Sequence, residues 1–156
     1  MKKFLAILLV LAFATCHDFP EDVRATADSE TFDAYLYNWD SEKDLALIGI
    51  RQSVPALDLA QRPKPGYWVM ALGSPYGLEG SVSIGNVINV DSAEVVTTAP
   101  FNSGNSGGPL VNVKGELVGL NTFILSASGG SQGLGFAIPS TVVDVASRQL
   151  REYGHL

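Results

Sequence analysis

Short apolar runs separated by small and polar residues dominate the chain beyond residue 20. The runs are rich in β-branched and aromatic side chains, and Gly, Pro, Asn and Ser stand between them. This pattern predicts strands joined by tight turns, and the close spacing of the runs is typical of a β-barrel or a β-sandwich. We expect strands at residues 67–75, 81–90, 93–100, 108–113, 116–125 and 134–140.

Local patterns also predict a hairpin and a helix. Residues 111–120 alternate on both sides of Lys114 and Gly115, which indicates a tight hairpin that turns at these two residues. Residues 140–154 start with a Ser/Thr cap and end at Gly154, as a helix does. The apolar face of this helix is expected to hold Val142, Val145, Ala146 and Leu150. No repeat, linker or second domain is evident.

The amino terminus has the pattern of a secretory signal. Two lysines precede an apolar run over residues 4–14, and Ala12 and Ala14 place small residues at the −3 and −1 positions of a cleavage site. The run is shorter than the roughly 18 residues that a membrane-spanning helix needs, so we expect no stable membrane anchor. A lipoprotein signal with Cys16 acylated fits less well. Such a signal usually has a bulky aliphatic residue at the position of Phe13 and a very small residue at that of Thr15. A buried strand or helix is the alternative for the run.

Composition narrows the classes of function. With 156 residues, 46% of them hydrophobic and 17% charged, the chain suits one domain with a packed core. A net charge of −6, without a run of Lys or Arg, lacks the positive surface that phosphate binding needs, so nucleic acid is not an expected partner. Cys16 is the only cysteine, which excludes an internal disulfide, and no Cys/His spacing resembles a metal site. No metal and no cofactor are expected.

The stretch GNSGG around Ser106 carries the candidate chemistry. It fits the G-x-S-x-G pattern of an α/β-hydrolase, with Asp144 and His155 following in the required order. That motif needs a helix directly after the serine, whereas Pro109 and the predicted hairpin follow here. The alternative is a serine on a glycine-rich loop between strands. There the amides of Gly104 and Ser106 would donate to a developing oxyanion. The alternative without catalytic function is an ordinary Gly/Ser turn between two strands.

Four stretches together resemble the protease domain of the HtrA (Deg) serine proteases, from about residue 34 to the carboxyl terminus. They are DLALIGI, GSPYGLEGSVSIGNVI, NSGNSGGPLVNVKGELVGLNT and GLGFAIPS. The resemblance implies an all-β fold of the chymotrypsin/trypsin-like double β-barrel type. It also implies an active site between the barrels and a catalytic triad in the order His, Asp, Ser.

The resemblance carries site residues over to matching positions. Ser106 becomes the nucleophile, and Gly104, Asn105 and Ser106 form the oxyanion loop. Asp44 matches the aspartate that orients the histidine, although it could simply end the loop NWDSEKD before an apolar strand. The first specificity pocket is expected to be lined by Phe101, Phe123, Ile124 and Leu125. None of these is acidic, so we infer a preference for apolar P1 side chains.

The histidine has two conflicting interpretations. His17 precedes Asp44 by 27 residues, and the segment ATCH resembles the family segment that ends in the catalytic histidine. The same residues overlap the predicted signal peptide, and cleavage after Ala14 would leave His17 as the third residue of the mature chain. Double barrels run to roughly 200–250 residues, so part of the first barrel is expected to be missing. Residues 1–14 are then either a signal peptide or a surviving barrel strand.

We therefore predict a trypsin-like serine protease domain over residues 15–156, with an incomplete first barrel and a C-terminal helix. The predicted function is that of a serine endopeptidase that cleaves exposed or unfolded polypeptides through an acyl-enzyme intermediate, with a role in protein quality control. A catalytically inactive, protease-like module that binds extended peptides is the alternative. The expected location is secreted or periplasmic. The expected partners are polypeptide substrates, and self-association into a homo-oligomer is left open.

Overall fold

The computed structural model describes residues 5–9, 23–27, 30–51, 55–74, 80–102, 104–124 and 133–153. By its contacts the chain divides into two compact units. The first contains Met1–Ala56 and Ala146–Leu156, and the second contains Leu57–Val145. The site residues Asp44 and Ser106 belong to different units, so each unit is described by itself.

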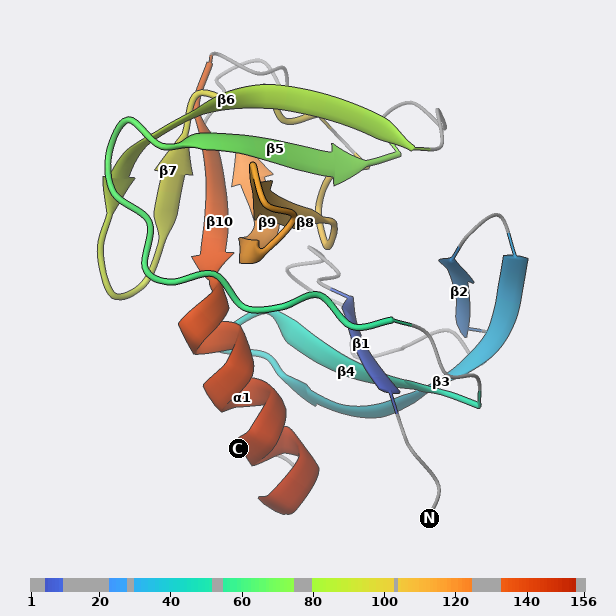
Figure 1. The fold of residues 1–156 in the computed structure, drawn as a ribbon. Helices are drawn as coiled ribbons and strands as arrows, with labels where there is room; N and C mark the ends of the chain where they lie inside the picture. Colours follow the sequence, from blue (N-terminus) through green and yellow to red (C-terminus); the bar gives the residue numbers. More distant parts are fainter. Residues whose placement is uncertain are drawn as a thin grey trace. The chain divides into compact units, whose positions relative to one another are not determined.

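The second unit is a closed antiparallel barrel (Figure 1). Its strands follow the order β10-β7-β6-β5-β8-β9 around the barrel. They are β5 (Trp68–Gly73), β6 (Ser81–Val90), β7 (Val95–Thr97), β8 (Pro109–Asn112), β9 (Leu117–Ile124) and β10 (Gly135–Pro139). Closure satisfies the hydrogen-bonding groups that an open sheet would leave at its edges.

Alternation along the strands places one set of side chains inside this barrel. In β5, for example, Val69 and Ala71 are buried whereas Trp68 is exposed, as the period of two requires. The core also takes residues from the loops that enter and leave the strands. Its buried members are Ala60, Val69, Ala71, Val87, Val95, Ala99, Phe101, Leu110, Val118 and Ala137.

The described strands of the first unit form a four-stranded sheet in the order β1-β4-β3-β2. They are β1 (Leu5–Leu9), β2 (Val23–Ala27), β3 (Glu30–Asp40) and β4 (Leu45–Ile50). All six residues of β4 are buried, which fits a continuous apolar run in a central strand. The final helix α1 (Ser140–Tyr153) is divided between the units, and Asn38 of β3 donates from Nδ2 to the carbonyl of Leu150 at 2.9 Å. This bond satisfies a carbonyl in the last turns of the helix.

The predicted fold class is confirmed: the described elements are ten strands and one helix, which follows the last barrel strand. The predicted hairpin is confirmed as well, because β8 and β9 pair antiparallel on either side of the turn that contains Gly115, whose φ is 77°. A hairpin directly after Ser106 excludes the α/β-hydrolase arrangement with Asp144 and His155.

Two local predictions were wrong. Val145 is 54% exposed, and the buried apolar positions of α1 are Val143, Ala146 and Leu150. Apolar residues outnumber the positions that the core accepts on the early turns of this helix, so the pattern alone chose the wrong valine. The predicted loop NWDSEKD is partly strand, since β3 extends to Asp40.

Residues 5–9 form strand β1, which pairs with β4 in the register Leu5↔Ile50 to Leu9↔Ala46. This is the arrangement expected if the apolar run is a barrel strand, while the signal peptide over 1–14 stays a prediction. Within the described part of the chain, no helix is long and apolar enough to cross a bilayer.

Candidate functional site

Ser106 lies in the loop that joins β7 to β8 in the second unit. Gly104 and Gly107 flank it with φ values of 101° and 83°, a left-handed conformation that side chains with a Cβ rarely adopt. The loop therefore folds back tightly on both sides of the serine. This conformation explains why glycines occupy those two positions.

The loop is fixed to the barrel strands on both sides. The Gly107 amide donates to the carbonyl of Asn121 at 2.8 Å, and the Asn121 amide returns a bond to the carbonyl of Gly108 at 2.9 Å. A Cβ on Gly108 would lie 2.1 Å from the carbonyl oxygen of Leu72, so the backbone of β5 approaches closer than any side chain allows. These contacts hold Ser106 on a rigid support, as a catalytic residue requires.

The backbone amides of the loop divide into two groups. Those of Asn105 and Gly108 donate within the loop, each at 3.0 Å, to the carbonyls of Asn102 and Asn105. Among the described residues, no acceptor is recorded for the amides of Gly104 and Ser106. Two amides two residues apart on one tight loop are the type of donor pair that stabilises an oxyanion.

The Ser106 hydroxyl is partly buried and donates to the carbonyl of Thr122 in β9, with an Oγ to O distance of 2.6 Å. A serine nucleophile must transfer this proton to a base as it attacks. A nucleophilic role for Ser106 would therefore require its hydroxyl to exchange the bond to Thr122 for one to a base. Thr122 and the fully buried Asn121 were not predicted as site residues. The sequence marks them only as a polar pair inside an otherwise apolar strand.

Asp44 stands directly before β4 in the first unit, where the sequence analysis placed it. Its φ of 54° is unusual for a residue other than glycine. The carboxyl group is partly buried, and burial raises the pKa of Asp44 above its ordinary value. A strained, partly desolvated carboxylate is a feature of functional sites more than of ordinary loop ends.

Asp40 has a different environment. It is 3% exposed, and its Oδ1 accepts the amides of Glu42 and Lys43 at 3.0 Å, while its Oδ2 pairs with the ammonium group of Lys43. Burial alone would raise the pKa of Asp40, but the bonds from Lys43 and Glu42 outweigh it and hold the pKa below its ordinary value. The turn between β3 and β4 thus uses Asp40 structurally and leaves Asp44 as the candidate for catalysis.

The other predicted residues are placed as follows. Phe101 is 2% exposed and lies in the barrel core against Gly135, where an added Cβ would be 2.7 Å from the ring. The backbones of Phe123 and Ile124 belong to β9. His17 and Leu125 lie outside the described residues. The structure therefore joins Gly104, Asn105 and Ser106 in one loop, while the triad and the pocket stay predictions.

Comparison with known proteins agrees with this arrangement. The model of the trypsin-like peptidase domain family matches residues 10–120. The periplasmic serine endoprotease DegP of Salmonella typhimurium is 41% identical over an alignment of 143 positions, which covers 83% of this chain and 30% of that protein. The periplasmic pH-dependent serine endoprotease DegQ of Escherichia coli is 37% identical over 142 residues, with 83% and 31% covered.

Solved structures give the same result. The HtrA-type protease AlgW, determined with a decapeptide, superposes with a TM-score of 0.78 and 36% identity, covering 84% of this chain and 44% of that one. The fold and the matched residues define a trypsin-like peptidase domain. Within that class, the chain belongs to the HtrA family of serine proteases. It spans about 30% of the length of the curated relatives that it matches.

Proposed function

We propose that this chain acts as a serine endopeptidase domain that cleaves exposed or unfolded polypeptides through an acyl-enzyme intermediate. The observation that carries the proposal is the Ser106 loop, with left-handed glycines on both sides and two amides free of described acceptors. Membership of a family whose members are named serine endoproteases supports it. The periplasmic location in the names of the relatives supports a secreted or periplasmic site of action, and a role in protein quality control follows from such a substrate class.

The proposed mechanism assigns a role to each residue. His17 takes the proton of the Ser106 hydroxyl as the oxygen attacks the scissile carbonyl, and Asp44 orients the imidazole and stabilises its charged form. The amides of Gly104 and Ser106 then bind the tetrahedral oxyanion. His17 returns the proton to the leaving amine, and water hydrolyses the acyl-enzyme. Phe101, Phe123, Ile124 and Leu125 form an apolar pocket that favours Val, Leu or Ala at P1 and excludes an unpaired Lys or Arg.

A fluorophosphonate probe, which reacts only with activated serines, tests this proposal. We expect labelling at Ser106 and degradation of an unfolded protein, and Ser106→Ala should lose both. The variant should fold with a stability change of about 1 kcal/mol at most, because it loses a single hydrogen bond, to Thr122.

Ser83→Ala is the matched control, because the Ser83 hydroxyl also donates to a barrel carbonyl, that of Pro100, at 2.6 Å. This variant should keep both labelling and proteolysis. Labelling that survives in Ser106→Ala would show that the nucleophile is a different residue. Folded wild-type protein that is never labelled would favour the catalytically inactive peptide-binding module instead.

A further inference from the structure

A concave surface lies at the end of the barrel strands where β5 begins and β8 ends. It has a volume of about 730 Å³ and lies between the chain segment that enters β5 and the turn between β8 and β9. We call it the barrel-end groove. The lining residues used below are Arg62, Lys64, Tyr67, Trp68, Val113 and Lys114. All of them belong to the second unit.

The groove is distinct from the Ser106 loop because the two lie at opposite ends of the same strands. The loop precedes the first residue of β8, whereas the groove lies at the turn after its last residue, Asn112. Likewise β5 runs from Trp68 in the groove to Gly73, whose Cβ position would lie 2.4 Å from Asn105 of the loop. A strand of five or six residues spans roughly 17–20 Å. A ligand in the groove therefore leaves the proposed active site open.

Hydrogen bonds fix both walls of the groove. In the entering segment, Ala60 donates to the carbonyl of Leu117 at 2.9 Å, and Gly66 donates to that of Val87 at 2.7 Å. In the opposite turn, Asn112 accepts the amides of Lys114 and Glu116 on Oδ1 at 2.9 and 3.0 Å. The groove is thus preformed, which reduces the entropy that binding must overcome.

The charge of the groove is opposite to that of the whole chain. Arg62, Lys64 and Lys114 are three of the ten lysines and arginines of a chain whose net charge is −6. Two carboxylates oppose these three cations, that of Glu116 in the lining and that of Asp91, which interacts with Arg62, so one positive charge remains in excess. Glu116 accepts from Asn112 at 2.7 Å, and Asp91 accepts the amides of Ala93 and Glu94 at 2.7 and 2.8 Å. The groove therefore favours a negatively charged ligand.

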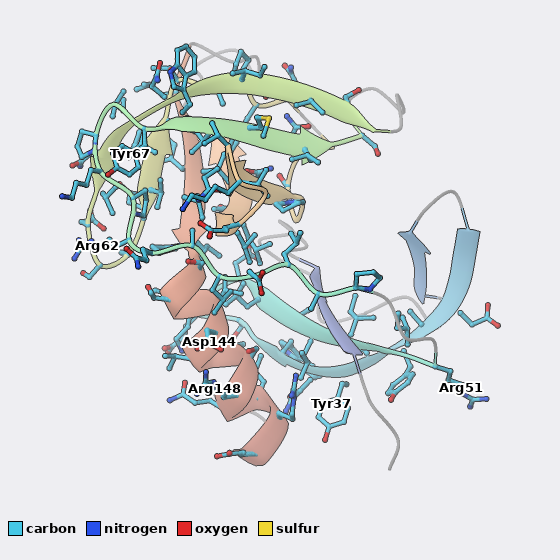
Figure 2. All side chains as sticks on the ribbon, in the orientation of Figure 1. Tyr37, Arg51, Arg62, Tyr67, Asp144 and Arg148 are labelled. Carbon is cyan, nitrogen blue, oxygen red and sulfur yellow. The ribbon has the colours of Figure 1, made fainter. Side chains whose placement is uncertain are left out.

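Apolar side chains stand exposed beside these charges. Tyr67 is 52% exposed, Trp68 is 57% exposed and Val113 is 73% exposed. Figure 2 shows Tyr67 and Arg62 on the same segment of chain that leads into β5. Aromatic and arginine side chains gathered in one pocket are the residue types that dominate binding energy at protein interfaces. A bare anion would leave these apolar surfaces in water.

We infer that the barrel-end groove binds an extended acidic polypeptide segment that carries apolar side chains. Its carboxylates pair with Arg62, Lys64 and Lys114, and an apolar side chain packs on Tyr67 and Trp68. The barrel is closed, so the segment is held by side chains and not by addition as a strand. This site is additional to the Ser106 loop, and its occupation does not depend on hydrolysis.

Fluorescence anisotropy on the Ser106→Ala chain tests this inference without cleavage of the probe. The probe is a labelled synthetic peptide that alternates Glu or Asp with Leu or Phe, and its Lys-substituted counterpart is the control peptide. We expect the acidic peptide alone to bind, more weakly at high ionic strength. Arg62→Glu combined with Lys114→Glu should weaken binding by about tenfold or more. Trp68→Ser should weaken it by about fivefold.

The matched control combines Arg51→Glu with Arg151→Glu, which makes the same change of net charge at exposed positions outside the groove. It should bind the acidic peptide within about twofold of the parent chain. Equal binding by the Arg62/Lys114 variant and the parent, or equal binding of the two peptides, would overturn the inference. Inorganic polyphosphate is a further probe. If its binding is weakened by the Arg62/Lys114 variant but unchanged by Trp68→Ser, the ligand of the groove is a simple polyanion and the peptide inference is wrong. Melting curves of every variant establish that it is folded.

Discussion

Two aspartates four residues apart have opposite environments. Asp40 is almost fully buried, yet it accepts two amides and pairs with Lys43, so its pKa is lowered. Burial raises the pKa of Asp44. The first aspartate stabilises the fold as an anion. The proposed triad would place the second aspartate beside a cationic imidazole, which would favour its ionised form.

The pH dependence of stability should separate these two aspartates. The folded-state pKa of Asp40 lies below the ordinary value of 3.8, so its stabilising effect is present above that pH and disappears as the pH falls through the folded-state value. Asp40→Asn should therefore lower the free energy of unfolding by about 1–2 kcal/mol at neutral pH and by little in strong acid. Urea titrations over a pH series measure this difference.

Asp44→Asn is the control, with the opposite sign. Its carboxyl group has a raised pKa, so ionisation costs stability as the pH rises past 3.8. At neutral pH the amide variant should be as stable as the parent or slightly more stable. A pH-independent loss in Asp40→Asn would show that the shape of the side chain, not its charge, holds the turn.

At the scale of elements, the Ser106 loop and the β8–β9 turn use glycine for different reasons. An added Cβ on Gly108 meets the carbonyl of Leu72 at 2.1 Å, whereas one on Gly115 meets nothing within 4 Å. Gly115 needs glycine only for its φ of 77°. A side chain at position 108 is excluded by the backbone of β5, whereas one at position 115 is disfavoured by the backbone conformation of that residue.

This difference predicts unequal effects of substitution. Gly108→Ala must displace β5 or the loop, so it should cost about 2 kcal/mol or more and reduce fluorophosphonate labelling at Ser106. Gly115→Asn should cost less than about 1 kcal/mol, because Asn tolerates the left-handed conformation, and should leave labelling intact. Thermal melts and probe labelling measure both effects. Equal losses in the two variants would contradict the close contact with Leu72.

At the scale of the whole molecule, the proposed triad takes residues from both units. Asp44 belongs to the first unit and Ser106 to the second, while the proposed base, His17, precedes both in the chain. The helix α1 is divided between the units, and Ala146 and Leu150 in its second part are fully buried. The proposed triad therefore predicts that catalysis requires both units to be folded.

A double-variant cycle tests whether the histidine and the serine act together. If His17 is the base, His17→Ala should lower kcat/KM for a peptide substrate by about 10⁴-fold, roughly 5.5 kcal/mol of activation free energy. The double variant with Ser106→Ala should be hardly slower than either single variant. His155→Ala is the control and should retain activity. Full activity in His17→Ala would remove this residue from the mechanism.

The sequence by itself determined the elements whose signals are local. Alternation and turn residues are read over a few neighbours, so the strand at 81–90, the hairpin around Gly115 and the helix at 140–153 agree closely with the structure. The Ser106 loop also has a local signal, because Gly104 and Gly107 adopt the left-handed conformation that favours glycine. Strands β2 and β3 went unpredicted, since they become strands through pairing: β3 pairs with β4, which is buried throughout, and β2 pairs with β3.

Tertiary structure alone decided what depends on residues far apart in the chain. It selected Val143 over Val145 for the buried face of α1, it gave Asp40 and Asp44 opposite pKa shifts and it placed β1 beside β4. It also brought Arg62 and Lys114, 52 residues apart in the sequence, to one groove at the end of the barrel. Burial and electrostatics depend on neighbours in space, and a linear pattern holds no record of which distant residues the closed sheet brings together.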